Sequence, residues 1–289
     1  MNAIEVKEVL LDAGPSNRHT LSFTVERGTV CGLVGKNGAG KTLLLQALVK
    51  QHRMNKGEIF LLGKSVTTQF EQVKPDIGVV WAMYYGPLHF TADHYRDFYK
   101  ELYQNWDDAY FYSLLEQFKI YRNEKIKTYS AGMLIKLQLA LALAHHPKLL
   151  ILDEPTAHLD PFARDELMEL LAQYMENGDN TIIISSHILS DLEKIADTIL
   201  YMAEGDILYH ENKDNMTSEF VLWRGELSSI VPKSAIIASK PTGLSREYLL
   251  AKKLLPDMFF EKYGQLVQAP TIEEYLLYTQ YATLKEGKS

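Results

Sequence analysis

The stretch Gly35-Lys36-Asn37-Gly38-Ala39-Gly40-Lys41-Thr42 decides the fold of this chain. Apolar residues 30–34 before it are typical of a buried strand, and apolar residues 43–49 after it are typical of a packed helix. A phosphate-binding loop needs this order, because the glycines turn backbone N–H groups toward phosphate oxygens and the helix N-terminus adds positive dipole. Lys41 is expected to reach the β- and γ-phosphates, and Thr42 to offer its hydroxyl to Mg²⁺. The alternative, a chance glycine turn with a surface lysine, would not match the whole stretch and both flanks.

The bulk composition is that of an ordinary globular protein. The chain has 289 residues, 46% of them apolar and 23% charged, which suggests one large domain or one plus a smaller one. A net charge of -7 argues against a broad nucleic-acid surface. The single cysteine, Cys31, lies in an apolar run, so a buried structural thiol in a reducing compartment is expected.

Membrane insertion of this chain itself is not expected. No run approaches the roughly 18 apolar residues that spanning a bilayer needs. The N-terminus lacks the charged and then apolar pattern of a signal peptide. The expectation is a cytosolic chain that meets a membrane only through a partner.

Strands and helices alternate along the first two thirds of the chain. Runs 4–9 and 21–25 alternate apolar and polar residues and predict an antiparallel layer beside the nucleotide core. Runs 149–152 and 181–185 are continuously apolar, as in buried parallel strands. The pattern predicts an α/β fold with a mostly parallel sheet.

A helical, unusually aromatic region is predicted over residues 91–120. It is either a docking surface for another protein or the core of a small helical subdomain, and the helical spacing favours the core. Ser130 is expected to cap a helix that ends at His145-His146. Adjacent histidines suggest a metal, but they face different sides, and a helix C-terminus favours them anyway.

The pattern changes after about residue 212. Ranges 220–224, 235–238 and 265–267 are strand candidates, and ranges 246–254 and 271–281 are helix candidates. Residues from about 216 onward carry no chemical motif and are interpreted as a small α+β appendage.

Two adjacent acids follow the apolar run 149–152. Asp153 lies 112 residues after Lys41, which leaves room for a helical insertion, and it is expected to hold Mg²⁺ opposite Thr42. Glu154 is expected to polarise the attacking water. His187 ends the following strand and is a candidate to contact the γ-phosphate and orient Glu154. A solvated strand end is the alternative for two adjacent acids, but an apolar strand and an upstream phosphate loop argue against it.

These motifs resemble those of the ABC ATPases. Residues 35–42 are similar to Walker A, and 149–154 to Walker B with its catalytic glutamate. Residues 153–161 resemble the continuation into the D-loop, and Tyr129-Ser130-Ala131-Gly132-Met133 resembles the signature motif. His187 matches the switch histidine. The resemblance covers about residues 4–209 and is closest to ATPase subunits of bacterial exporters of antibiotics and peptides.

The resemblance implies a domain plan and a site. The expected domains are an ABC ATPase domain over 1–215, with a helical subdomain over about 84–146, and a C-terminal accessory domain over 216–289. Implied catalytic residues are Glu154, His187 and Lys41, and implied Mg²⁺ ligands are Thr42 and Asp153. Implied ATP-binding residues are Gly35, Asn37, Gly38, Ala39, Gly40, Lys41, Thr42, Ser130, Ala131, Gly132 and Asp160.

The resemblance also implies partners. ABC ATPases form head-to-tail dimers, in which each ATP lies between one subunit's Walker A and the signature of the other. The expected partners are a membrane permease and a second ATPase subunit, in a homodimer or a heterodimer, at the cytoplasmic face of the membrane. Hydrolysis would open the dimer and drive alternating access, and the expected cargo is peptides or drug-like molecules for export.

Several positions depart from the family pattern. The signature has Ala131 where glycine is usual, and the Q-loop glutamine is replaced by Ala82. An aromatic residue that stacks on adenine is expected near Ala13, but none is present there, and His19 is the candidate substitute. His158 occupies a position where glycine is more common. Either this branch of the family has relaxed requirements at these positions, or the chain is one half of an asymmetric heterodimer.

Three other functions compete with the transport ATPase. Soluble ABC proteins of translation generally carry two nucleotide domains, and chromosome ATPases carry a long coiled coil that the 112-residue spacing forbids. A nucleotide-binding regulator with weak or no hydrolysis would be expected to lose Glu154 or His187, and both are present. The sequence therefore favours an ATPase.

Overall fold

The structure is a computed structural model that describes residues 1–12, 20–227, 229–242 and 245–286. The chain forms two compact units, Met1–His210 and Glu211–Ser289, and the first ends a few residues before the predicted boundary. Each unit has its own hydrophobic core.

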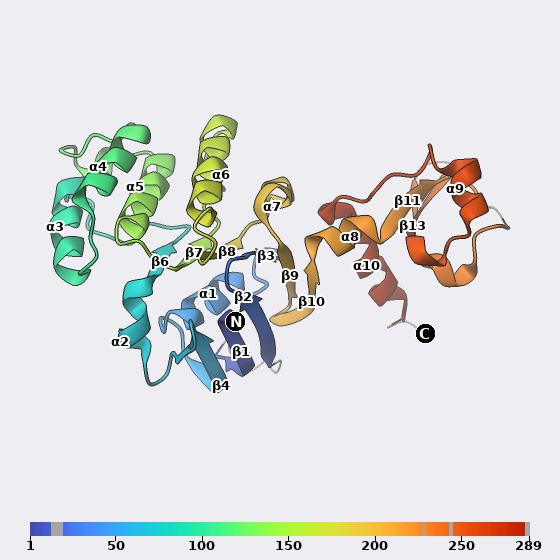
Figure 1. Ribbon diagram of the computed structural model, residues 1–289, viewed down its shortest axis with the longest axis horizontal. Helices are drawn as coiled ribbons and strands as arrows, with labels where there is room; N and C mark the ends of the chain where they lie inside the picture. The colour runs from blue at the N-terminus through green and yellow to red at the C-terminus, as the bar shows by residue number, and fades with distance from the viewer. Residues whose placement is uncertain (13–19, 228, 243–244, 287–289) are drawn as a thin grey trace. The chain divides into compact units, whose positions relative to one another are not determined.

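The centre of the first unit is a six-stranded sheet (Figure 1). In spatial order its strands are β10 (Asp206–Asn212), β9 (Thr198–Ala203), β3 (Val30–Val34), β8 (Thr181–Ser185), β7 (Leu149–Asp153) and β6 (Ile77–Val80). Strand β3 pairs in parallel with β8 and β9, and β7 pairs in parallel with β8 and β6. Every residue of β3, β7 and β8 is buried, as parallel strands covered on both faces require. The carboxyl ends of these three strands therefore meet at one edge.

The predicted antiparallel layer is confirmed. Its strands are β2 (Leu21–Glu26), β1 (Asn2–Leu11), β4 (Met54–Leu61) and β5 (Lys64–Ser65). Helix α1 (Lys41–Leu48) contacts β1 and β4 of this layer and β7 of the central sheet, so it lies between the two sheets. Cys31 on β3 is fully buried, and burial raises the pKa of its thiol to about 12, consistent with an inert structural role.

A block of helices gathers at one end of the first unit (Figure 1). It consists of α3 (Ala92–Leu102), α4 (Asp108–Gln117) and α5 (Ala131–Leu143), with the one-turn helix η2 (Ile126–Thr128). The region predicted as helical over 91–120 is interrupted where Asp107 caps α4 by accepting from Tyr110 N–H. Its aromatics divide: Phe111 is fully buried, whereas Tyr85, just before the block, is 73% exposed.

The remaining helices of this unit are short connectors or cover the sheet. They are α2 (Phe70–Val73), η1 (Lys74–Asp76), α6 (Pro161–Met175) and α7 (Leu189–Ile195). After α5, His145 is buried, stacks on Tyr103 with ring centroids 4.0 Å apart, and bonds to Ile77 O. The stacking and the hydrogen bond are packing contacts that hold this histidine in the core of the unit.

The second unit is built on the antiparallel sheet β11 (Phe220–Arg224), β13 (Ser245–Ala251) and β12 (Ile236–Thr242). Its helices are α8 (Lys213–Ser218), α9 (Asp257–Tyr263), α10 (Ile272–Glu286), η3 (Lys233–Ala235) and η4 (Lys252–Leu254).

Two of the predictions for the second unit are wrong. The predicted helix over 246–254 is mainly β13, the central strand, because pairing with two neighbours outweighs the helix preference of its Leu and Ala residues. The predicted strand over 265–267 does not form; only Gln268 makes an isolated bridge, with Leu222. Helix α9 is an element that the sequence pattern did not indicate.

A buried carboxylate lies within this second unit. Glu247 on β13 is 5% exposed and accepts hydrogen bonds from Tyr278 Oη and Arg224 Nε. Burial alone would raise the pKa of Glu247, but the hydrogen bonds from Tyr278 and Arg224 outweigh burial, and the pKa is lowered. The charged form of Glu247 is therefore the form that stabilises this unit.

We expect Glu247→Gln to destabilise the second unit by about 1–3 kcal/mol at pH 7, because its charge-assisted hydrogen bonds are lost. The contribution of Glu247 is present above the unfolded pKa of about 4.3 and is lost as the pH falls through the lower folded pKa. Hydrogen exchange of β13 peptides, corrected for intrinsic rates, measures this directly. The wild type should lose protection on acidification more steeply than Glu247→Gln. Glu261→Gln, an exposed acid of the same unit, is the control, and equal behaviour of both variants would contradict the expectation.

Candidate nucleotide-binding site

The loop between β3 and α1 has the backbone that phosphate binding needs. Gly38 and Gly40 have φ of 83° and 101°, the left-handed region that glycine adopts freely. A side chain at Gly35 would meet Met202 O at 2.2 Å, so this glycine lets the loop lie against β9. Ala39 O accepts from Gly205 N at 3.1 Å, which anchors the loop to the β9–β10 turn. Within the described chain no side chain caps α1, which leaves its first N–H groups for an anion.

Lys41 is the buried cation of the loop. It is 6% exposed, and its Nζ donates to Gly35 O at 2.7 Å. The same Nζ lies 3.4 Å from Glu154 Oε1. The structure thus brings the predicted lysine and the predicted water-polarising acid together.

Thr42 and Asp153 face each other across the strand ends. Thr42 Oγ1 donates to Asp153 Oδ2 at 2.9 Å, and Asp153 Oδ1 accepts from Ser185 Oγ at 2.7 Å. A hydroxyl and a carboxylate oxygen beside a phosphate loop are the hard donors that Mg²⁺ prefers. The two residues therefore fit the ion that the sequence predicts.

Glu154 has an unusual backbone. Its φ is 48°, although it is not glycine. Its N–H donates to Ser185 Oγ at 2.9 Å and Ser185 O at 3.2 Å. Its Oε2 accepts from His187 N at 3.2 Å and lies 2.5 Å from His187 Nδ1. The carboxylate is thereby held between Lys41 and His187.

The residues of the predicted signature lie apart from this cluster. Ser130 caps α5, accepting from Met133 N at 3.2 Å as predicted, and Ala131 begins that helix. Gly132 lies under Leu159, whose Cδ2 is 3.2 Å from where a side chain would begin. Asp160 caps α6, with Oδ1 accepting from Phe162 and Ala163 N–H groups at 3.0 Å each.

No hydrogen bond joins Ser130 or Asp160 to loop 35–42, all of which the structure describes.

Two contacts that shape the site were missed from the sequence. Ser185 was seen only as the end of a strand, although a hydroxyl at the carboxyl end of an apolar strand beside β7 was a usable signal.

The second missed contact lies at the end of β6, where the Q-loop glutamine is absent. Gln138 on α5 accepts from Trp81 N at 3.2 Å and donates to Trp81 O at 3.1 Å, just before Ala82. Ala13, near which an aromatic residue for adenine is expected, and the substitute His19 lie outside the described residues.

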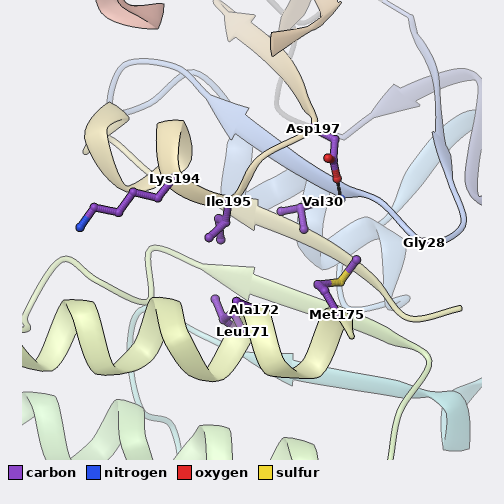
Figure 2. Close-up of a pocket in the computed structure, with 8 residues that line it drawn as sticks. All are labelled: Gly28, Val30, Leu171, Ala172, Met175, Lys194, Ile195 and Asp197. Carbon is purple, nitrogen blue, oxygen red and sulfur yellow. Dashed lines mark hydrogen bonds between the residues drawn. The ribbon is translucent and has the colours of Figure 1, made fainter. Parts of the chain in front are cut away.

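A cavity of about 330 Å³ is separate from these residues (Figure 2). It lies between β3 and helices α6 and α7, with Leu171, Met175 and Val30 among its lining residues. Asp197 at its edge accepts from Val30 N at 2.7 Å, whereas the Lys194 side chain points away from it. None of the predicted site residues lines this cavity.

The loop, the Thr42–Asp153 pair and the Glu154–His187 pair define a P-loop nucleoside triphosphatase. A sequence model of the family described as ABC transporter matches residues 18–157. The chain is 31% identical over 250 residues to an uncharacterized ABC transporter ATP-binding protein of Bacillus subtilis, YhcH, covering 82% of this chain and 79% of YhcH. It is 34% identical over 195 residues to the Nod factor export ATP-binding protein I of Rhizobium meliloti, covering 64% and 56% of the two chains.

A solved structure has the same fold. The dimeric post-hydrolysis state of the ATP-binding cassette MJ0796, bound to ADP and Pi, superposes with a TM-score of 0.65 at 19% identity. The match covers 72% of this chain and 98% of that one. The predicted P-loop ABC ATPase fold, with a mixed α/β core and a helical subdomain, is confirmed.

This chain belongs to the ABC transporter ATP-binding family. It is an ATP-binding ATPase subunit of a transporter, as predicted. Subunits of this family dimerise and associate with a membrane permease at the cytoplasmic side. Among the described residues, no helix has the length and apolar character needed to span a membrane.

Proposed function

We propose that this chain binds ATP with Mg²⁺ at loop 35–42 and hydrolyses it to power export through a permease. The observation that carries the proposal is the convergence of Lys41, Glu154 and His187 beside the Thr42–Asp153 pair. When bound, Mg²⁺ would neutralise charge on the β- and γ-phosphates, with Thr42 and Asp153 as its protein ligands.

The loop and Lys41 bind the phosphates. Backbone N–H groups of 35–42 and the uncapped N-terminus of α1 meet the phosphate oxygens. Lys41, held by Gly35 O and beside Glu154, exchanges these partners for the more strongly charged phosphates.

Glu154 and His187 act on water. Once Lys41 has turned to the phosphate, Glu154 Oε1 is free to accept a proton from the attacking water. His187, bonded to Oε2 through its N–H and Nδ1, fixes the carboxylate and is the proposed contact to the γ-phosphate. The remaining charge is stabilised by Lys41 and the helix N-terminus.

A second subunit completes the site. Ser130, Ala131 and Gly132 start α5, and Asp160 starts α6, without a hydrogen bond to their own loop. Beside Asp160, Phe162 is 83% exposed, as a residue of an interface would be in an isolated subunit. We infer that these residues face the ATP of a partner in a head-to-tail homodimer or heterodimer; the solved structure of one fold relative is a dimer bound to ADP and Pi.

Export is supported by one relative, whose name describes it as a Nod factor export protein. We infer that the permease-bound complex exports peptides or drug-like molecules from the cytoplasmic face. The accessory domain over 216–289 carries none of the proposed nucleotide ligands.

Affinity purification from membranes tests this proposal. The Glu154→Gln variant, which should hold ATP without turnover, is expected to bring down an integral-membrane permease together with a second ATPase subunit. Co-expression of the wild-type chain with that permease should raise resistance to a panel of peptide antibiotics, and Glu154→Gln should abolish this gain. Recovery of the chain without any membrane protein would contradict the transport role, whereas a permease without resistance would contradict this choice of cargo.

A further inference from the structure

One buried hydroxyl touches both acids of the site. Ser185 is the last residue of β8 and is fully buried. Its Oγ donates to Asp153 Oδ1 at 2.7 Å and accepts from Glu154 N at 2.9 Å. A serine hydroxyl has a single proton, so donation to Asp153 leaves its lone pairs to receive the Glu154 N–H. The two contacts therefore fix the orientation of the hydroxyl.

The first contact sets the plane of the Asp153 carboxylate. Asp153 is 2% exposed, and its two oxygens have different partners, Ser185 at Oδ1 and Thr42 at Oδ2. With Oδ1 held by Ser185, Oδ2 is the oxygen directed at the Thr42 hydroxyl. Without the serine, a buried acceptor would lose its partner and the carboxylate could rotate.

The second contact holds a backbone that a glutamate rarely adopts. The left-handed conformation of Glu154 is strained, and persists only where neighbours impose it. Both oxygens of Ser185 that can accept, Oγ and the carbonyl O, receive the Glu154 N–H, at 2.9 and 3.2 Å. This backbone places the Glu154 carboxylate between Lys41 and His187.

We propose that Ser185 is a positioning residue that sets the geometry of the metal-binding acid Asp153 and the water-polarising acid Glu154 together. The inference rests on the proposed function for the roles of these two acids. Ser185 itself contacts neither nucleotide nor water in this scheme; it acts through the two carboxylates.

The test compares Ser185→Ala with the hydroxyl-retaining Ser185→Thr. Ser185→Ala should lower kcat by about 10–100-fold, as loss of a partner that orients metal ligands typically does. Ser185→Thr should recover most of kcat. Where Ser185→Ala does not fold, Ser185→Cys, whose thiol is a weak donor, takes its place with the same expected loss.

A binding measurement separates positioning from general damage. Binding of a fluorescent ATP analogue in EDTA should be the same for wild type and Ser185→Ala, because the loop is untouched. The tightening that Mg²⁺ adds should be about 10-fold smaller in the variant, since the Asp153 oxygens are no longer held. An equal Mg²⁺ effect in both proteins would overturn the proposal.

A hydroxyl at the other end of the same strand provides the matched control. Thr181 begins β8, is fully buried, and accepts from Gly28 N at 3.1 Å, away from the acids. Thr181→Val should lower the urea midpoint about as much as Ser185→Ala and leave kcat unchanged. Equal losses of kcat in both variants would show a structural role and overturn the proposal.

Failure of this inference is distinguishable from failure of the proposed function. If Glu154→Gln is inactive and folded Ser185→Ala keeps kcat within threefold of wild type, only the role of Ser185 is overturned. If Glu154→Gln keeps wild-type turnover, the assignment of Glu154 fails, and the Ser185 proposal falls with it.

Discussion

Replacing Glu154 by glutamine will lower the rate of ATP hydrolysis by about 10²–10⁴-fold, the range that removal of a general base gives. Glutamine keeps the size of the side chain and an acceptor oxygen, but it cannot take a proton from water. The substitution should affect catalysis selectively. The Glu154 backbone is held by hydrogen bonds from its N–H to Ser185, which do not involve the carboxylate. The loop and Lys41 remain, so ATP affinity should hold or increase as one anion beside Lys41 disappears.

Steady-state phosphate release and equilibrium binding of a fluorescent ATP analogue measure the two effects separately. Glu166→Gln, an amidation of a half-exposed glutamate that pairs with Lys136 on the surface, is the matched control and should hydrolyse ATP at the wild-type rate. Unchanged turnover in Glu154→Gln would remove the water-polarising role from this residue. Loss of binding together with turnover would instead indicate a damaged loop.

Replacing Lys41 by alanine will weaken ATP binding by about 10–150-fold, the affinity equivalent of a charge-assisted hydrogen bond of about 1.5–3 kcal/mol. Lys41 is the buried cation next to the loop, and its positive charge is balanced locally by Glu154. Its removal also leaves the partly buried Glu154 facing incoming phosphate without compensation. Turnover should therefore fall with affinity, beyond what saturation with ATP restores.

The matched control is Lys36→Ala in the same loop. Lys36 is exposed. Its backbone oxygen accepts from Ala39 N at 3.0 Å, a contact that does not involve its ammonium group. Isothermal titration with ATP and Mg²⁺ should show affinity within about twofold of wild type for Lys36→Ala, since surface charges contribute little. Equal losses in the two lysine variants would mean that net charge, and not the position of Lys41, governs binding.

The contiguous parts of the site were predictable from the sequence because neighbours in the chain determine them. The glycine pattern of 35–40 specifies its own backbone, and the helix that follows supplies the dipole. Asp153 and Glu154 were found because they end a continuously apolar strand. Ser130 was identified as a cap because capping is a local interaction.

Contacts between distant segments were not predictable in the same way. Ser185 meets the acids only because β7 and β8 are adjacent in register, with Asp153 opposite Ser185. The left-handed backbone of Glu154 depends on Ser185, and the residue type at position 154 does not indicate it. Gln138 lies on α5, and only its two hydrogen bonds to the Trp81 backbone, at the end of β6, explain a polar side chain at that position.

The second unit shows where pattern reasoning fails. The run over 246–254 is rich in helix-forming residues, and a short apolar run of this length fits either a helix or a central strand. Pairing with β11 on one side and β12 on the other decides in favour of the strand. Such pairing is a long-range property, and in this chain only the structure shows it.

The two hydrogen bonds between Gln138 and Trp81 have a mechanical consequence. They tie the middle of α5, whose first turn carries Ser130 and Gly132, to the residue that follows β6. A rotation of α5 must therefore break both bonds or carry the end of β6 with it. A displacement of the helix therefore reaches the start of the segment that carries the exposed side chains of Met83 and Tyr85.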